Sequence, residues 1–113
     1  MLAATNAVGE TLALAKGLGV DPKDFFDAVG GGPLDMGYLH AKAALVLEDR
    51  LSPAAFAVST AEKDARLIVA AGERYGVRLD LAAACAERFA RAAAQGHGAE
   101  DMAAAYFASF DAP

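Results

Sequence analysis

Residues 51–77 read LSPAAFAVSTAEKDARLIVAAGERYGV, and this stretch indicates the fold of the chain most directly. A Ser-Pro turn opens it, and a long run rich in alanine and free of proline follows. Alanine is the best helix former, and the apolar residues recur at helical spacing. The stretch therefore predicts a helix that starts near Ala54–Phe56 and continues to about Tyr75, where Gly76 stops it.

The remainder of the chain also shows helical spacing interrupted by turn residues. Asp21 followed by Pro22 is a strong helix start, because an aspartate caps the free N–H groups and proline suits the first helical position. No segment alternates with the period of two that a half-buried strand requires. The other expected helices are residues 1–18, a short helix opened by Asp21-Pro22 and ended at Gly30, Leu34 to Glu48, Leu81 to Gln95 with Asp80 as its cap, and Glu100 to Phe110.

Composition supports one helical domain. The chain has 113 residues, of which 56% are hydrophobic, and alanine supplies much of that fraction. This length is enough for one modest core. We therefore predict an all-α fold for residues 1–113, a single domain of about six helices without significant sheet.

The charge balance and the cysteine count exclude several classes of function. The net charge is −5 and no block of basic residues occurs, so binding to nucleic acid is not expected. No apolar run approaches the length of a membrane span, and no signal peptide is visible. Cys85 is the single cysteine, which fits a reducing cytoplasm, and its alanine-rich surroundings favour a buried, inert thiol.

Three further features are weak candidates for chemistry. The glycine run Gly30–Gly32 matches no phosphate-loop motif, so a helix connection is favoured, although such a loop could line a substrate pocket. His40 and His97 are isolated and complete no set of metal ligands, so no metal site is expected. His97 lies between two glycines at the end of a helix, where we expect it to cap backbone carbonyls.

The adjacent Lys63-Asp64 pair is the most informative candidate. On a helix, Asp64 shares its face with the apolar Leu67 and Ile68, whereas Glu62 lies on the solvent side. A carboxylate on a packing face loses hydration and needs a cation or several donors. From spacing alone, a solvated pair at the margin of the helix, or an aspartate bonded to a nearby helix, is favoured. No obvious partner for Asp64 exists within the chain, which leaves room for one from outside it.

Three motifs, in order, resemble the C-terminal helical domain of the β-hydroxyacid dehydrogenase family, which includes 3-hydroxyisobutyrate dehydrogenase. ATNAVGETLALAKGLGVDP (residues 4–22) resembles the second half of the long interdomain helix and the turn after it. The stretch quoted first resembles the family's signature, in which a phenylalanine precedes by eight residues the aspartate of a Lys-Asp pair. AAAQGHGAEDMAAAY (residues 92–106) resembles the closing Gly-x-Gly-x-x-Asp segment.

The resemblance implies a fold like the C-terminal domain of 6-phosphogluconate dehydrogenase and a parent enzyme that uses NAD or NADP. That enzyme would interconvert a small β-hydroxyacid, or a related alcohol, and its aldehyde or ketone. Phe56 would lie near the nicotinamide and substrate, and Lys63 would line the cofactor side of the cleft. Asp64 would pair with the family's general-acid lysine.

The chain departs from the family pattern in three places. The N-terminal Rossmann domain is absent, and so is the Lys-x-x-x-Asn motif, which would fall just before Met1. The proline that commonly follows the signature phenylalanine is Ala57 here. A helical pattern that begins at Met1 without a cap fits either a cut through a longer helix or a frayed terminus. The resemblance favours the cut, and we expect the chain alone to bind no cofactor and to be inactive.

An alternative hypothesis is a free-standing helical module that forms a homodimer through small-residue faces and catalyses nothing. Its support is the abundance of alanine, which lets helices approach closely. Both hypotheses predict a homodimer, because a domain separated from its neighbour must cover the apolar surface once buried there.

Overall fold

The computed structural model describes residues 1–111, and within them the fold is all-α, as predicted. The one strand-like feature in this part of the chain is an isolated antiparallel bridge between Ala57 and Asp101. The elements are α1 (Leu2–Leu18), α2 (Pro22–Val29), α3 (Gly37–Leu47), α4 (Val58–Arg74), α5 (Asp80–Ala92), the π-helical turn η1 (Ala93–His97) and the 3-10 helix η2 (Met102–Ser109).

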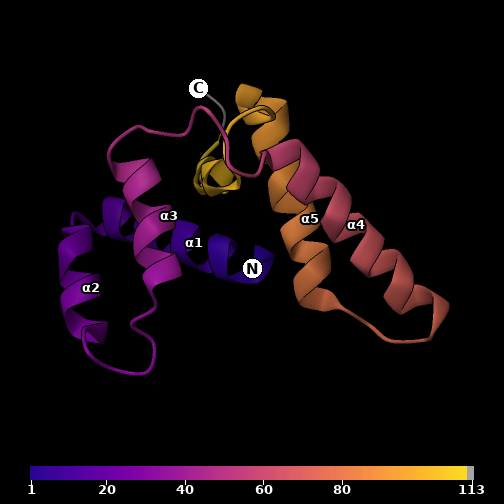
Figure 1. Ribbon diagram of the computed structural model, residues 1–113, viewed down its shortest axis with the longest axis horizontal. Coiled ribbons are helices and arrows are strands. Elements are labelled where there is room, and N and C mark those ends of the chain that lie inside the picture. Colours follow the sequence, from indigo (N-terminus) through magenta and orange to yellow (C-terminus); the bar gives the residue numbers. More distant parts are fainter. Residues whose placement is uncertain (112–113) are drawn as a thin grey trace.

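The helices form an arch (Figure 1). α1 and η2 pack together at its centre, α2 and α3 form one arm, and the antiparallel pair α4–α5 forms the other. The N-terminal end of α1 lies beside α5, under the bend of the arch. This arrangement places the start of the chain against the arm that carries Lys63 and Asp64.

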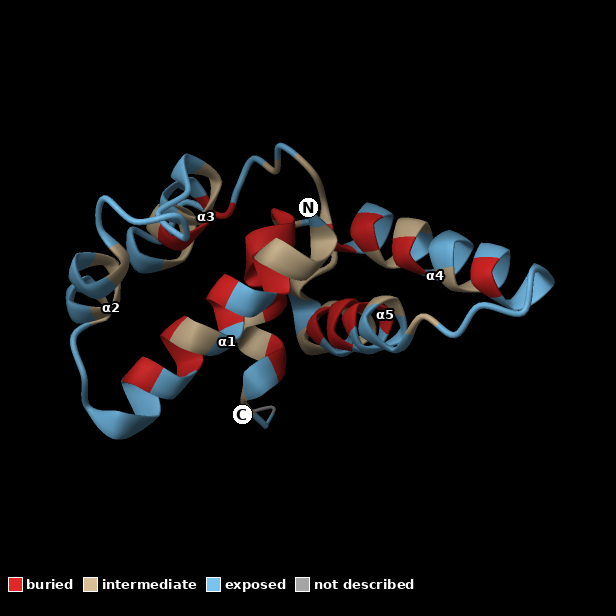
Figure 2. Cartoon of the chain, turned by 90° about the horizontal axis from the view of Figure 1, so that it is seen from below, coloured by how far each residue is buried: buried red, intermediate tan, exposed pale blue. Residues whose placement is uncertain are grey.

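The core consists of two clusters that meet at η2. The larger cluster joins α4, α5 and η2, with Phe89 and Met102 as its largest fully buried side chains. The smaller one joins α1 to α3 through Val8, Leu12 and Ala43. α1, α4 and α5 each carry buried positions interspersed with exposed ones (Figure 2). Alanine fills many of the buried positions, so the helices approach closely.

α3 begins at Gly37 rather than at Leu34 as predicted. The reason is a turn over residues 32–35, closed by the Asp35 N–H, which donates to the Gly32 carbonyl. The Asp35 carboxylate also accepts a hydrogen bond from the Gly31 N–H and pairs with His40. That hydrogen bond and the nearby His40 hold the pKa of Asp35 below its ordinary value. The glycine run is a connection between two helices, as expected.

α4 begins at Val58, two to four residues later than predicted. Ala57 is extended and pairs with Asp101, while the Met102 N–H donates to the Phe56 carbonyl and the Val58 N–H to that of Glu100. The backbone just before Val58 is therefore hydrogen-bonded to residues 100–102 and does not continue the helix.

Two expectations about helix ends are wrong. Asp80 is the first residue of α5 and not its cap, since Leu79 occupies the cap position and no side chain accepts a hydrogen bond there. His97 caps no carbonyl: its ring stacks on Phe107 at a centroid distance of 4.1 Å and pairs with Glu100. α5 proper ends at Ala92, short of Gln95, and the last helix is a 3-10 helix whose cap is Asp101.

Candidate functional site

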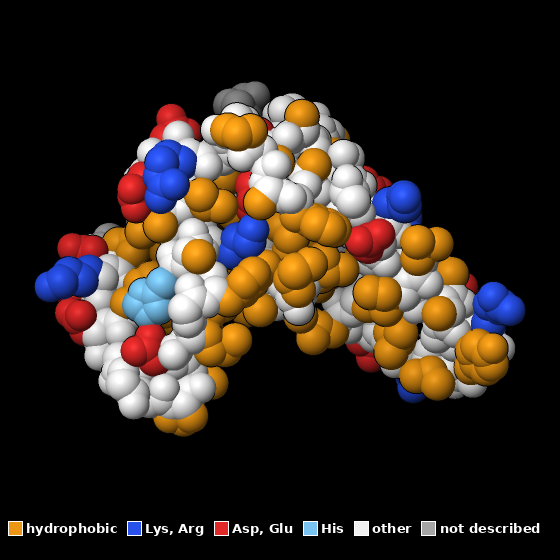
Figure 3. Space-filling view, viewed as in Figure 1, with side chains coloured by type: hydrophobic (Ala, Val, Ile, Leu, Met, Phe, Trp, Pro, Cys, Tyr) orange, Lys and Arg blue, Asp and Glu red, His pale blue; other side chains and the backbone are white. Residues whose placement is uncertain are grey.

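A groove of about 660 Å³ lies between the N-terminal end of α1 and the α4–α5 arm. Figure 3 shows hydrophobic side chains gathered at this bend and along the arm. Most of the lining side chains are apolar. The charged ones are Asp64 of α4, Arg78 of the loop between α4 and α5, and Asp80 at the start of α5. The residues that matter below are Met1, Leu2, Asp64, Ile68, Leu81 and Cys85.

Asp64 lies in the second turn of α4, is half-buried, and lines this groove. The expectation that its face is the packing face of α4 is wrong. Leu67 is 60% exposed and Ile68 45% exposed. The buried positions of α4 lie roughly 90° around the helix from Asp64, at about 100° per residue; they are Val58, Ala61, Ala65 and Gly72.

This face of α4 packs against α5 and against the loop that joins the two helices. A Cβ atom on Gly72 would lie 2.7 Å from the Val77 carbonyl oxygen and 2.7 Å from a methyl group of Leu79. Val77 and Leu79 lie in the loop between α4 and α5, so a side chain at position 72 would collide with that loop. The larger apolar residues Leu67 and Ile68 are turned outward. Asp64 is left at the margin between the packed face and the groove.

Asp64 and Lys63 do not pair with each other. Adjacent residues on a helix point in different directions, and Lys63 is exposed while Asp64 faces the groove. Among residues 1–111, neither side chain forms a hydrogen bond or an ion pair within the chain. A carboxylate in a mostly apolar groove can accept a cation or a hydrogen-bond donor that enters it.

Phe56 lies in the non-helical segment just before α4 and is half-buried against the larger core cluster. Its backbone N–H donates to Asp101 Oδ1 at 3.3 Å. Other residues form the wall of the groove, so the structure does not bring Phe56 and Asp64 together in that cavity. Phe56 nevertheless precedes the first residue of α4 by only two positions, and its location is tied to that helix.

The structure shows a buried ion pair that sequence reasoning missed. Lys42 of α3 binds Asp101 at 2.9 and 3.1 Å, and the two residues are 8% and 1% exposed. The motif analysis noted Asp101 only as the end of a Gly-x-Gly-x-x-Asp segment. One signal pointed to Lys42: it is the single permanent cation in a helix whose neighbouring turns carry Leu39 and Leu45.

A second buried cation joins α1, α5 and η2. Arg88 donates to Asn6 Oδ1 at 2.8 Å, to the Ala105 carbonyl at 2.8 Å, and to Glu10 at 3.2 Å. Burial lowers the pKa of Arg88, and the Glu10 carboxylate opposes that shift. These contacts satisfy buried hydrogen-bonding groups at the junction of three helices, so Arg88 is a structural residue.

Cys85 lies at the base of the groove and is buried, as expected. Burial raises the pKa of its thiol, with a smaller opposing effect from the Asn6 side chain. A thiol with a raised pKa is a poor nucleophile. Within residues 1–111, no three histidine, cysteine, aspartate or glutamate side chains are placed so that they could hold a metal ion.

None of the described helices is both long enough and apolar enough to span a bilayer.

Comparison with known proteins identifies the family. Residues 1–108 match the family described as "NAD-binding of NADP-dependent 3-hydroxyisobutyrate dehydrogenase". The crystal structure of 3-hydroxyisobutyrate dehydrogenase from Salmonella typhimurium superposes with a TM-score of 0.81 at 24% identity, over 93% of this chain. The chain spans 38% of that protein's length. No curated protein matches at a significant level. The match over nearly all of its length shows that the chain belongs to the 3-hydroxyisobutyrate dehydrogenase family, through the domain described as NAD-binding.

Proposed function

We propose that the chain is the C-terminal helical domain of an NAD(P)-dependent oxidoreductase that interconverts a small β-hydroxyacid, or a related alcohol, and its aldehyde or ketone. In this proposal the chain forms the substrate side of a cleft against a nucleotide-binding domain. One observation carries the proposal: the motif carboxylate, Asp64, is half-buried on the wall of an apolar groove beside the first residues of α1. The family match over residues 1–108 supports it.

Asp64 would hold and orient the general-acid lysine of the complete enzyme. A carboxylate at this position favours the charged form of a lysine within a few ångströms, and keeps the proton available to the substrate oxygen. Bound NAD(P)H would supply a hydride to the carbonyl carbon. The proton held at the lysine would pass to the carbonyl oxygen, so that the alcohol forms without a free alkoxide.

Lys63 and Phe56 would act on the cofactor side. The exposed Lys63 ammonium, without an ion pair among the described residues, is suited to a negatively charged dinucleotide. Phe56 offers an aromatic ring beside the entry to α4, where it could exclude water from the nicotinamide. Both roles are proposed from the motif and from these positions.

A chimera tests the proposal. The chain is joined to the nucleotide-binding domain of the Salmonella typhimurium dehydrogenase, which supplies the missing lysine, and oxidation of NADH and NADPH is followed with a panel of small aldehydes and oxo acids. We expect turnover by the chimera, a loss of about 10²-fold or more in the Asp64→Ala chimera, and no turnover by the chain alone. A chimera that folds but binds neither cofactor would refute the proposal.

We also propose that the exposed apolar side of the α4–α5 arm forms a homodimer interface. Leu67 and Leu81 are 60% and 67% exposed, and Leu81 also lines the groove, so the two residues belong to a continuous apolar surface of the kind that marks interaction sites. This surface equally suits the alternative of a non-catalytic dimerisation module. Sedimentation equilibrium of the chain, alone and as the Leu67→Asp/Leu81→Asp variant, tests the interface: we expect a dimer that becomes a monomer. An unchanged mass in the variant would refute this interface.

The Asp64→Ala variant separates the two functions. An enzyme domain should lose turnover in the chimera and keep its mass, whereas a dimerisation module should change in association or folding. The cytoplasmic location expected from the single free cysteine stays a prediction.

A further inference from the structure

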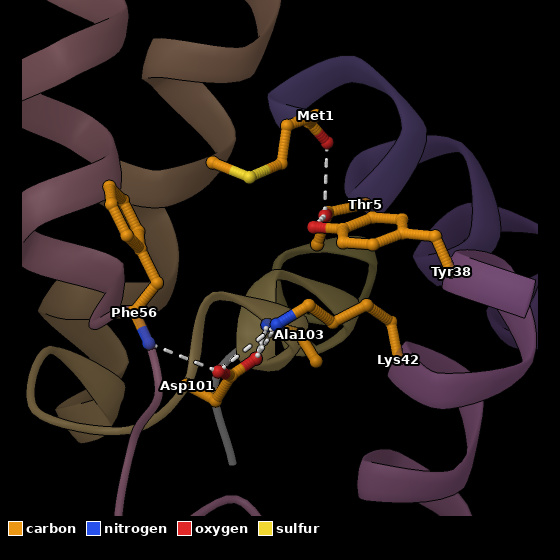
Figure 4. A network of polar contacts seen from close by, with 7 residues as sticks. All are labelled: Met1, Thr5, Tyr38, Lys42, Phe56, Asp101 and Ala103. Carbon is orange, nitrogen blue, oxygen red and sulfur yellow. Dashed lines mark hydrogen bonds and ion pairs between the residues drawn. The ribbon is translucent and has the colours of Figure 1, made fainter.

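Asp101 is a fully buried carboxylate that binds three separate parts of the chain. Oδ1 and Oδ2 accept hydrogen bonds from Lys42 Nζ at 3.1 and 2.9 Å. Oδ2 also accepts from the Ala103 N–H at 2.9 Å, which caps η2, and Oδ1 accepts from the Phe56 N–H at 3.3 Å. One side chain therefore joins α3, the start of η2 and the segment that leads into α4 (Figure 4).

Lys42 is itself held in place by its surroundings. Its ammonium lies 5.6 Å from the centre of the Tyr38 ring, within the range of a cation–π contact. The Tyr38 hydroxyl shares a hydrogen bond of 2.8 Å with Thr5 Oγ1, and the Thr5 hydroxyl donates to the Met1 carbonyl. The ion pair is thus connected to the first turn of α1, which borders the groove (Figure 4).

The backbone around Phe56 is held on both of its polar groups. The Phe56 N–H binds the Asp101 carboxylate, and the Phe56 carbonyl accepts from the Met102 N–H at 2.7 Å. Asp101 also donates its own N–H to the Leu51 carbonyl at 2.8 Å. The position of residues 51–56 is therefore fixed by hydrogen bonds to Asp101 and Met102 and not by helical hydrogen bonds.

A buried ion pair contributes little net stability compared with apolar side chains of the same volume. What apolar side chains cannot do here is accept hydrogen bonds from the Phe56 and Ala103 N–H groups. The ion pair therefore acts on position. The Lys42 ammonium fixes the Asp101 carboxylate, and that carboxylate binds the backbone at Phe56 and at Ala103.

We propose that Lys42 and Asp101 form a positioning pair that sets the location of Phe56 at the entry to α4. The relevance of Phe56 to catalysis rests on the proposed function, but the positioning does not. Asp101 is a positioning residue here, because it acts through the Phe56 backbone and touches no substrate.

Amide hydrogen exchange of the 113-residue chain tests the proposal. The variant Lys42→Met/Asp101→Leu removes the pair and every acceptor on the side chain at position 101, whereas Lys42→Met/Asp101→Asn returns one acceptor oxygen. Leu12→Ala, in the smaller core cluster, lowers stability without touching Phe56. The Phe89 amide of α5 reports unfolding of the core in each protein.

We expect the Phe56 amide to exchange about tenfold faster in the leucine variant, since the free energy of a hydrogen bond to a charged group corresponds to at least this factor. The exchange rate of the Phe89 amide should change by less. The asparagine variant should recover part of the protection, and Leu12→Ala should leave the Phe56 amide no more accelerated than that of Phe89. A Phe56 rate that follows the Phe89 rate in all three variants would overturn the proposal.

Should the leucine variant fail to fold, the asparagine variant decides alone. A larger increase in exchange rate at Phe56 than at Phe89, each relative to the unsubstituted chain, supports the positioning role. A ratio of the two rates equal to that in the unsubstituted chain overturns it. No cofactor or substrate enters this experiment, so its failure is distinct from a chimera that fails to bind NAD(P)H.

Discussion

Two Lys-Asp pairs of this chain can be compared. Lys63 and Asp64 are neighbours in the sequence, yet they make no contact with each other, and Lys63 is exposed. Lys42 and Asp101 are 59 residues apart, yet they form a buried ion pair with contacts of 2.9 and 3.1 Å. Adjacency along a helix directs side chains apart by about 100°, whereas packing of α3 against η2 directs two distant side chains to the same point.

The comparison separates a structural charge pair from a candidate functional one. A carboxylate with all of its hydrogen bonds satisfied inside the fold, such as Asp101, has no capacity left for a substrate or a catalytic group. A carboxylate in a groove with no partner among the described residues, such as Asp64, keeps that capacity. Three of the four predictions that follow test this difference, and the other tests the packing of α4 that leaves Asp64 at the edge of the groove.

The largest effect is expected from removing one charge of the buried pair. Lys42→Met leaves the Asp101 carboxylate buried without its cation, which should lower the free energy of unfolding by about 3–5 kcal/mol. The matched control is Lys63→Met, which should change it by less than about 0.5 kcal/mol because Lys63 is exposed. Urea unfolding followed by circular dichroism measures both. Equal losses in the two variants would contradict the distinction between the pairs.

The next effect concerns the face of α4 that packs on α5. Gly72→Ala should lower the free energy of unfolding by about 1–2 kcal/mol, because the new methyl group overlaps the Val77 carbonyl and Leu79. The same substitution at Gly17 of α1 meets nothing within 4 Å and should stabilise the chain by up to about 1 kcal/mol. Thermal unfolding of both variants measures whether each substitution lowers or raises the stability of the chain. Stabilisation by Gly72→Ala would mean that the loop between α4 and α5 does not pack closely against Gly72.

A smaller loss is expected when both charges of the buried pair are replaced. Lys42→Met/Asp101→Asn leaves no unpaired charge, and the amide oxygen of the new side chain can still accept the hydrogen bond that caps η2. We therefore expect a net loss of about 1 kcal/mol, less than in Lys42→Met alone. Urea unfolding of the two single variants and the double variant completes the thermodynamic cycle. Simple addition of the single losses would show that the two residues do not interact.

The smallest effect on stability is expected at Asp64. Asp64→Ala removes a side chain without a described partner and places a good helix former in α4, so the free energy of unfolding should change by less than about 0.5 kcal/mol. In the chimera the same variant should lose most of its turnover. A large loss of stability in Asp64→Ala, comparable with that in Lys42→Met, would make Asp64 a second structural carboxylate.

The helices and several of their ends were predictable from the sequence, because the signals are local. Asp21 accepts the hydrogen bond from the Lys23 N–H that an N-cap residue is expected to accept. Gly19 ends α1 in the left-handed conformation, with φ of 70°, which glycine adopts readily. The family was predictable as well, since three short motifs occur in the order that its members share, and the match over residues 1–108 confirms it.

Two of the errors in the prediction have a nonlocal cause. Phe56 was placed inside a helix, but its backbone is bound by Asp101 and Met102, which lie some 45 residues away. The packed face of α4 was centred on Asp64 because Leu67 and Ile68 are the larger apolar residues there. The fold instead buries Val58, Ala61, Ala65 and Gly72, which face α5 and the loop between the two helices.

The all-helical fold, the family, and the position of the Lys63-Asp64 motif along the chain follow from the amino-acid sequence without further information. These depend on local propensity, capping and short patterns, which act within a few residues. The packing of the helices was needed to establish that Asp64 opens into a groove and that Asp101 binds Lys42. Whether a carboxylate is satisfied or left available depends on which distant helices meet around it, and the spacing of residues along one helix does not contain that information.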